Sequence, residues 1–154
     1  MVDSHEFSTG QCETLLRAEV AGRVAVSTPT GPQITPVNYT VVDDAIIIKT
    51  TPYSVLGTHG RDMTLAFEID GFDRARERGW SVQARGRAEV VTDRDELAHI
   101  RTVADRPPWA SGLRSMYLRI RWNELSGRQL GRLWDPIGLM QPTPGEGTGR
   151  VQTT

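Results

Sequence analysis

The chain has 154 residues, of which 38% are hydrophobic and 24% are charged, and its formal net charge is -1. This length suits one domain with a hydrophobic core and is hardly enough for two. Basic residues are scattered among acidic ones, as in "DRARERG" and "DRDELAHIR", so the basic stripe of a nucleic-acid-binding protein is missing and we expect no such partner.

The N-terminal stretch "MVDSHEFSTGQCETLL" carries acidic residues where a signal peptide would carry basic ones, and it has no apolar segment. No later segment approaches the roughly 18 apolar residues of a membrane span. We therefore expect a cytoplasmic protein with no membrane partner. Cys12 is the only cysteine, which excludes an internal disulfide, and its place in a predicted helix favours a packing role.

The elements follow from capping residues and from alternation along the chain. "STGQCETLLRAEVAG" predicts a first helix with Ser8 or Thr9 as N-cap and an end near Gly22. "TPYSVLGTHGRD" predicts a short helix with Thr51 as N-cap. "TDRDELAHIRTVAD" predicts another with Thr92 or Asp93 as N-cap, whose Leu97, Ile100 and Val103 face the core. Alternating or apolar runs predict strands over residues 23–29, 33–42, 45–51, 63–72, 79–93 and 115–130.

Two residues inside predicted strands carry local information. Pro36 cannot donate to a strand ladder, so it belongs on an edge strand, at a bulge, or where the backbone faces something other than a strand. Gly86, in the middle of the long run "GWSVQARGRAEVVTD", predicts a bend or a close backbone approach.

Closely spaced strands with few helices predict a closed or nearly closed barrel. We assign residues 1–133 to this single domain. Residues 134–154 have too little apolar content to offset the entropy of ordering, and they are predicted to form a flexible C-terminal tail.

The sequence lacks the usual catalytic motifs. His5, His59 and His99 are not grouped at metal-ligand spacing, so no metal is expected. GxSxG, P-loop and GxGxxG motifs are absent. What remains is "KTTPYS", which places an ammonium, the three hydroxyls of Thr50, Thr51 and Ser54, and the N–H groups of a helix start within six residues, a combination suited to a phosphate monoester. An ordinary capped helix is the alternative interpretation.

The neighbouring strand segment "TPVNY" is predicted to pair with the strand that leads into that helix. A planar ring could then lie along one strand while its phosphate reaches the other, a geometry that suits flavin mononucleotide (FMN).

The order "GRVAVS…PVNY…IIIKTTP…FEID…GWSVQARGRAEVV" followed by "YLRIRWNELSGRQL" resembles the pyridoxamine 5'-phosphate oxidase-like proteins of the flavin split-barrel superfamily, in their small actinobacterial-type branch. The resemblance covers about residues 10 to 130. It implies a mostly β protein with short helices, a six-stranded antiparallel split β-barrel, that forms a homodimer with flavins in clefts between subunits. The cofactor-binding positions that it implies are Pro36, Val37, Asn38 and Tyr39 beside the ring, Lys49, Thr50, Thr51 and Ser54 along the ribityl and phosphate, and Trp80 lining the cleft.

One position departs from the family pattern. Relatives commonly carry a basic residue after the small hydroxyl of the short helix, whereas here Ser54 is followed by Val55. The phosphate must then rely on Lys49, Arg61 or backbone amides. A deazaflavin coenzyme in place of FMN, or an empty cleft, is therefore an alternative.

The resemblance implies an oxidoreductase that passes electrons between the flavin and a small-molecule substrate. No catalytic residue can be assigned, and Tyr39 and Ser81 are the only proton-capable candidates nearby. Pyridoxamine phosphate oxidation itself is not expected, because alternation sends Arg119 and Arg121 to the outer face, away from a second phosphate. A non-catalytic flavin or ligand carrier is the second hypothesis.

Overall fold

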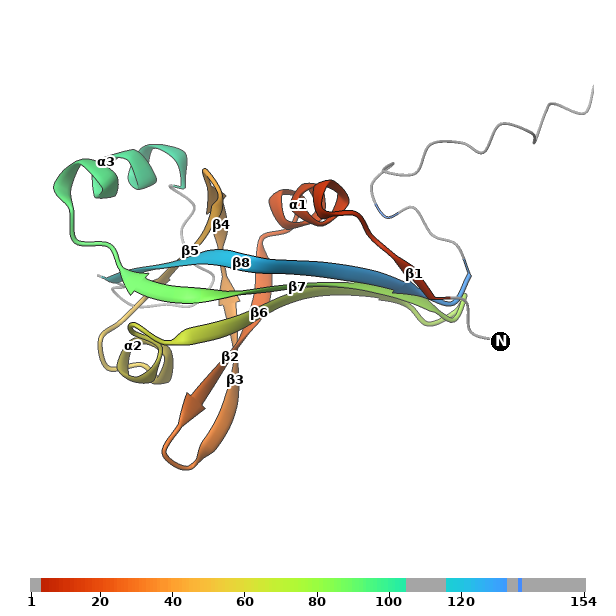
Figure 1. The fold of residues 1–154 in the computed structure, drawn as a ribbon, viewed down its shortest axis with the longest axis horizontal. Helices are drawn as coiled ribbons and strands as arrows, with labels where there is room; N and C mark the ends of the chain where they lie inside the picture. Colours follow the sequence, from red (N-terminus) through yellow and green to blue (C-terminus); the bar gives the residue numbers. More distant parts are fainter. Residues whose placement is uncertain (1–3, 105–115, 133–135, 137–154) are drawn as a thin grey trace, which may run out of the picture.

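The computed structural model describes residues 4–104, 116–132 and 136. Eight strands and three helices follow one another along these residues (Figure 1). In chain order they are β1 (Ser4–Glu6), α1 (Thr9–Ala18), β2 (Ala21–Thr28), β3 (Gly31–Asn38), β4 (Thr40–Val42), β5 (Ala45–Thr50), α2 (Val55–His59), β6 (Thr64–Asp73), β7 (Arg78–Val90), α3 (Arg94–Val103) and β8 (Met116–Leu130). The predicted tail, 134–154, lies outside the described residues except for Pro136.

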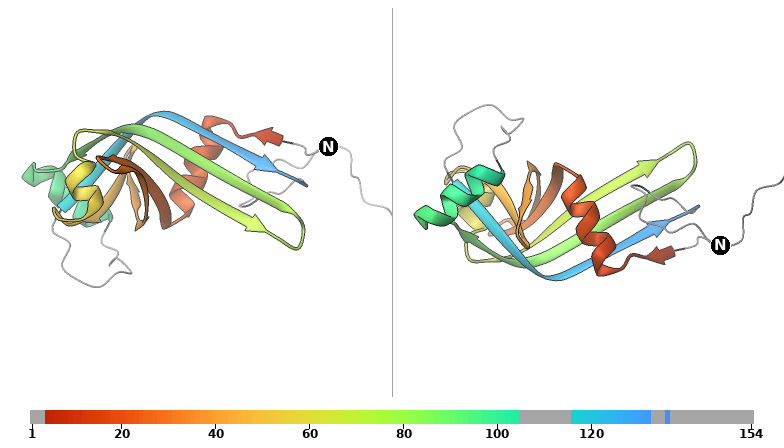
Figure 2. Two further views of the ribbon diagram at one scale, coloured as in Figure 1. Left: turned by 90° about the horizontal axis from the view of Figure 1, so that it is seen from below. Right: turned by 90° about the horizontal axis from the view of Figure 1, so that it is seen from above.

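The strands form one antiparallel sheet in the order β3-β2-β6-β7-β8-β5-β4, with β1 paired to β8. Its two edge strands, β3 and β4, are consecutive in the chain, so the sheet curls until its ends meet. Strands β6, β7 and β8 reach well beyond this curled part (Figure 2). The prediction of a mostly β split barrel is confirmed, although the strand count is higher than six.

The first added strand arises because the predicted strand 33–42 is divided at Tyr39. Before Tyr39 the chain pairs with β2, and after it with β5. The Tyr39 backbone N–H donates to the Val20 carbonyl at 3.0 Å, while its ring is buried at 5% exposure. The change of partner strand is what allows an open sheet to curl, and alternation along the sequence carries no sign of it.

The second added strand, β1, pairs Ser4–Glu6 with Arg128–Leu130. All three of its residues are exposed and polar. Without an apolar face it has no alternation from which a strand could be predicted.

Helix α1 closes one opening of the barrel with Cys12, Leu15 and Leu16, which are fully buried. Ser8, one of the two predicted caps, is its N-cap and forms a capping box with Gln11. The helix ends at Ala18, well before the predicted end. Gly22 lies instead in β2, where an added Cβ would stand 2.5 Å from Phe67 Cζ.

Gly86 marks an irregularity between β7 and β8. The register shifts between Arg85 and Gly86, and an added Cβ at Gly86 would collide with the Arg121 carbonyl oxygen. The predicted close backbone approach is therefore confirmed. A bulge at this point adds local twist, which helps the long strands to bend around the core.

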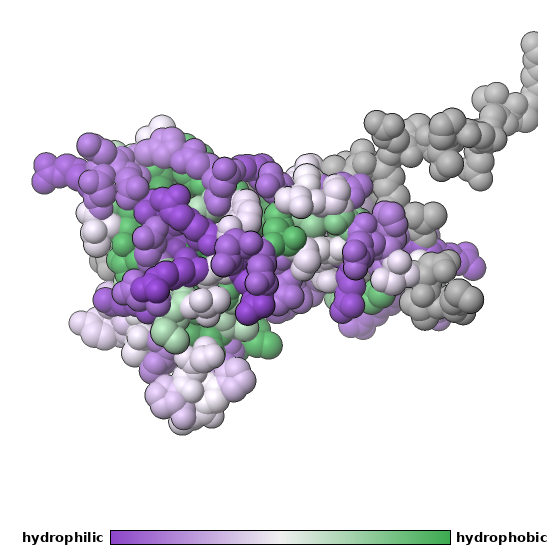
Figure 3. Space-filling view, in the orientation of Figure 1, coloured by the Kyte–Doolittle hydropathy of each residue, from purple (hydrophilic) through white to green (hydrophobic). Residues whose placement is uncertain are grey.

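Helix α3 covers the outer face of the sheet, which is opposite to the face that lines the barrel core. Asp93 caps it, and Ile100 packs into a second cluster with Ile47, Val91 and Tyr117. Val103 was predicted to face the core but is 52% exposed, because it lies in the last helical turn, past the edge of that cluster. The face seen in Figure 3 is hydrophilic over much of β7, β8 and α3.

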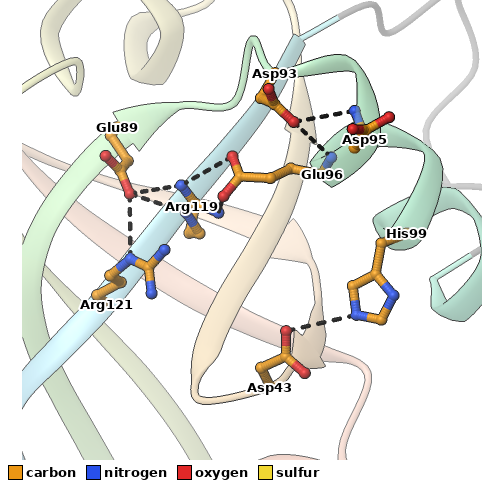
Figure 4. A network of polar contacts seen from close by, with 8 residues as sticks. All are labelled: Asp43, Glu89, Asp93, Asp95, Glu96, His99, Arg119 and Arg121. Carbon is orange, nitrogen blue, oxygen red and sulfur yellow. Dashed lines mark hydrogen bonds and ion pairs between the residues drawn. The ribbon is translucent and has the colours of Figure 1, made fainter.

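Arg119 and Arg121 lie on this outer face, as alternation predicted, between β7 and α3 (Figure 4). Arg119 is 2.9 Å from Glu89 and 3.1 Å from Glu96, and Arg121 is 3.3 Å from Glu89. Burial alone would raise the Glu89 pKa, but the hydrogen bonds from the two arginines lower it overall. This network attaches α3 to the sheet.

Candidate cofactor site

The strongest local cluster among the predicted site residues is at the end of β5. Thr50 Oγ1 lies 2.7 Å from Ser54 Oγ, and Thr50 is buried. Ser54 Oγ also accepts a hydrogen bond from the Gly57 N–H at 2.9 Å and donates to the Thr51 carbonyl at 2.9 Å. Two of the predicted hydroxyls therefore meet at the start of α2.

The cap of α2 differs from the predicted one. Helix α2 begins at Val55 with Ser54 as its N-cap, whereas Thr51 was predicted. Pro52 and Tyr53 form a turn before the helix. Ser54 takes the role because its hydroxyl reaches the Gly57 N–H, and the Thr51 carbonyl is bonded to the Ser54 backbone N–H at 3.2 Å.

The other predicted segment, Pro36 to Tyr39, runs along the edge strand β3 and its junction with β4. Pro36 therefore sits on an edge, as its missing N–H requires. Val37 and Asn38 are half-buried, and β3 contacts β5. The fold thus brings the two segments together where β3 ends and β4 begins to pair with β5. We call this place the seam of the barrel.

Tyr39 faces the interior at this seam. Its hydroxyl donates to the Leu16 carbonyl at 2.6 Å, and its ring meets Phe67 edge to face at 4.7 Å. Burial raises the Tyr39 pKa, with a smaller contribution from Glu19. A hydroxyl that is bonded to a helix carbonyl and hard to ionise anchors α1 to the barrel and is poorly placed to exchange protons with a substrate.

Lys49 lies on the opposite face of β5 from Thr50. Its Nζ stands 5.5 Å from the centre of the Tyr117 ring, on the side that carries α3. Arg61 is on the α2 side, where its Nε donates to the Gly57 carbonyl at 2.7 Å. Of the two cations considered for a phosphate, Arg61 is thus the one next to the hydroxyl cluster.

Trp80 lies far from this cluster within one chain. It is 5% exposed, and an added Cβ on Gly71 would stand 2.5 Å from its Nε1. Trp80 pairs with Gln129 near the end of β8, whereas Thr50 pairs with Met116 at its start. The thirteen residues between those positions span about 40 Å along the strand.

Ser81, the second proton-capable candidate, lies on the face of β7 opposite to Trp80. It lines a hollow of about 530 Å³ whose polar walls include Glu68, Gln83, Ser126 and Arg128. Arg23, the cross-strand neighbour of Pro36, extends this polar surface with bonds of 2.6 and 3.2 Å to Asp70. Partial burial raises the Glu68 pKa, and Asp70 raises it further. These polar residues come from four strands, β2, β6, β7 and β8, so in the sequence they stand apart from one another.

Two apolar residues beside Ser54 were not predicted as site residues. Tyr53 is 94% exposed and Val55 is 37% exposed. Tyr53 lies in the turn between Pro52 and the helix cap, where its ring faces solvent. That position in the sequence was the available signal.

None of the helices among the described residues is long and apolar enough to cross a membrane.

Comparison with known proteins agrees with this architecture. The sequence profile of the family described as "Pyridoxamine 5'-phosphate oxidase" matches residues 8–129. The uncharacterized protein Rv0080 of Mycobacterium tuberculosis is 30% identical over 111 residues, which are 69% of this chain and 72% of that protein.

Two solved structures share the fold over most of the chain. The FAD binding protein from Mycobacterium smegmatis is 25% identical with a TM-score of 0.69, and the match covers 80% of this chain and 96% of that one. A conserved protein of unknown function from Corynebacterium diphtheriae is 28% identical with a TM-score of 0.69, covering 81% of this chain and 96% of that one. The family resemblance read from the sequence is confirmed.

Proposed function

Because this chain belongs to the pyridoxamine 5'-phosphate oxidase family, we propose that it binds a flavin at the seam between β3 and β5 and acts as an oxidoreductase on a small molecule. The observation that carries the proposal is the contact between the edge strand β3 and β5, the strand that leads through Thr50 to Ser54 at the start of α2. The FAD-binding relative from Mycobacterium smegmatis supports a flavin as the ligand class.

The residues at the seam fit such a group. Strand β3 offers a sheet edge to the rim of a planar ring, and the half-buried Asn38 lies at its end. The hydroxyls of Thr50 and Ser54 fix the start of α2 through their own hydrogen bonds, and the guanidinium of Arg61 nearby supplies donors suited to a phosphate. FMN, which carries a single phosphate, is the form that we propose. A bound flavin supplies the hydride and one-electron chemistry, while the chain orients it and limits the access of water.

We also propose a homodimer, and the position of Trp80 is the reason. Within one chain Trp80 pairs with the end of β8, whereas Ser54 follows Thr50, which pairs with the start of β8. A site that contains both residues must therefore combine two chains. The long β6–β7 hairpin reaches beyond the barrel and could carry Trp80 to a partner (Figure 1). Light scattering at micromolar concentration tests this: a dimeric mass is expected, and a monomeric mass removes Trp80 from the site.

A non-catalytic flavin carrier is the second candidate. It is favoured by the Tyr39 hydroxyl, which is bonded to the Leu16 carbonyl and is therefore poorly placed to exchange protons. Adding a reduced nicotinamide to the purified, flavin-loaded protein separates the two. Bleaching that reverses in air supports an oxidoreductase, and a stable yellow colour supports a carrier.

Cofactor identity is tested by the spectrum of the compound released on heating, which distinguishes FMN from FAD and from a deazaflavin. Arg61→Gln should weaken FMN binding about tenfold and leave riboflavin, which has no phosphate, nearly unchanged. Lys49→Met is the matched control on the opposite face of β5. Equal losses of both ligands in Arg61→Gln would place the phosphate elsewhere.

A further inference from the structure

A cavity of about 550 Å³ lies where the turn of the β6–β7 hairpin meets the end of β8. Figures 1 and 2 show this turn and α2 at opposite ends of the molecule. The volume falls within the range of roughly 300–1,000 Å³ that is usual for small-molecule sites. Its walls come from the hairpin turn, between Phe72 and Gly79, and from Leu130, Gly131 and Arg132 at the end of β8.

The cavity carries an excess of positive charge, with four arginines against two carboxylates. Asp73 Oδ2 binds Arg76 at 3.0 Å and Arg78 at 3.2 Å, so this carboxylate is shared by two guanidinium groups. Within the part of the chain that the structure describes, Arg74 and Arg132 form no ion pair. These two side chains are therefore available to an anion.

The backbone that holds them is well fixed. Gly131 adopts a φ of +82° and lies against the Glu77 carbonyl, which joins the end of β8 to the hairpin turn. The buried Gln129 side chain donates to the Arg132 carbonyl at 3.2 Å. The Arg132 backbone is thus held by the hydrogen bond to its own carbonyl and by the close packing of Gly131 before it.

One wall of the cavity is apolar. Phe72, Gly79 and Leu130 face each other across three strands. The Phe72 ring covers Gly79, where an added Cβ would stand 2.6 Å from its Cδ1, yet the residue is 68% exposed. An accessible ring beside unpaired arginines offers stacking and charge recognition at the same place.

We propose that this cavity binds a phosphate ester of a compound with a planar ring, with Arg74 and Arg132 on the phosphate and Phe72 against the ring. Arginine suits this task because its planar fork of donors matches phosphate oxygens. Within one chain the site uses none of the residues at the seam, although its hairpin is the one that would carry Trp80 to a partner in the proposed dimer.

Isothermal titration calorimetry on the full chain at low ionic strength tests it with three probes: AMP, adenosine and inorganic phosphate. AMP should bind more tightly than either of the others. The double variant Arg74→Gln, Arg132→Gln should weaken AMP about tenfold or more while leaving adenosine unchanged. Phe72→Ala should weaken AMP and adenosine but not phosphate. The control is Arg87→Gln, an exposed arginine of β7 outside the cavity, which should change none of them.

Three results would overturn the proposal. The first is the absence of saturable AMP binding at millimolar concentration. The second is an equal loss in Arg87→Gln, which would indicate unspecific attraction by surface charge. The third is complete displacement of AMP by riboflavin, which would place AMP at the flavin seam. A change of oligomeric state in Phe72→Ala, seen by light scattering, would instead assign Phe72 to a protein interface and also end the proposal.

Discussion

Replacing Ser54 by alanine should destabilise the protein more than an ordinary helix-cap substitution. Loss of an N-cap typically costs about 1 kcal/mol. Here Ser54 Oγ is also the partner of the buried Thr50 hydroxyl at 2.7 Å, and leaving a buried hydroxyl unpaired costs about 1–3 kcal/mol more. We therefore expect Ser54→Ala to lower the free energy of unfolding by about 2–4 kcal/mol in urea titrations.

A double-mutant cycle with Thr50→Val separates the two contributions. Valine removes the hydroxyl that Ser54→Ala would leave unpaired, so the double variant should lose at least about 1 kcal/mol less than the sum of the single losses. Thr58→Ala, in the exposed part of the same helix, is the control and should stay within about 0.5 kcal/mol. A Ser54→Ala loss below about 0.5 kcal/mol, or strict additivity in the cycle, would refute this account of the hydroxyl pair.

Three further predictions concern the barrel and its outer face. Arg119→Gln should lower the free energy of unfolding by about 1 kcal/mol at neutral pH, since its carboxylate partners are more than 40% exposed. Because the Glu89 pKa is lower in the folded state than in the unfolded chain, this difference should be present above about pH 4.5 and should shrink as the pH falls through the folded value. A loss that does not shrink as the solution is made more acidic would contradict it. Gly22→Ala should lower Tm by several degrees in thermal unfolding, because the new methyl group meets Phe67 and the Glu68 carbonyl, and an unchanged Tm would mean that the ring moves aside freely. Val55→Lys should tighten FMN relative to riboflavin in fluorescence titrations if the phosphate lies at the start of α2, and equal changes for both would argue against that position.

Much of the fold could be predicted from the sequence because its signals are local. Ser8 and Asp93 are capping residues followed by apolar faces, and the structure uses them as N-caps. Gly86 indicated a close backbone approach, and Pro36 indicated an edge. Each of these residues constrains its own backbone, so its effect does not depend on distant parts of the chain.

What could not be predicted depends on tertiary pairing. The division of β3 from β4 at Tyr39 follows from a hydrogen bond to Val20, which no periodicity reveals. The face on which Lys49 lies is set by pairing with β8, and alternation alone left both faces open. The separation of Trp80 from Ser54 becomes visible only once the strands are aligned along β8. The candidate site was therefore predictable as a set of segments, while its assembly was not.

Strand β8 also determines when the barrel can form. It pairs with β1, β5 and β7, so it joins residues from the start, the middle and the later part of the sequence. During synthesis these pairings must wait until residue 130 has been made, and until then β5 and β7 present unpaired edges. Such long-range pairing gives a high contact order, which slows folding. The nascent protein is thus most exposed to aggregation just before its last strand emerges, and co-translational chaperone binding should be strongest at that stage.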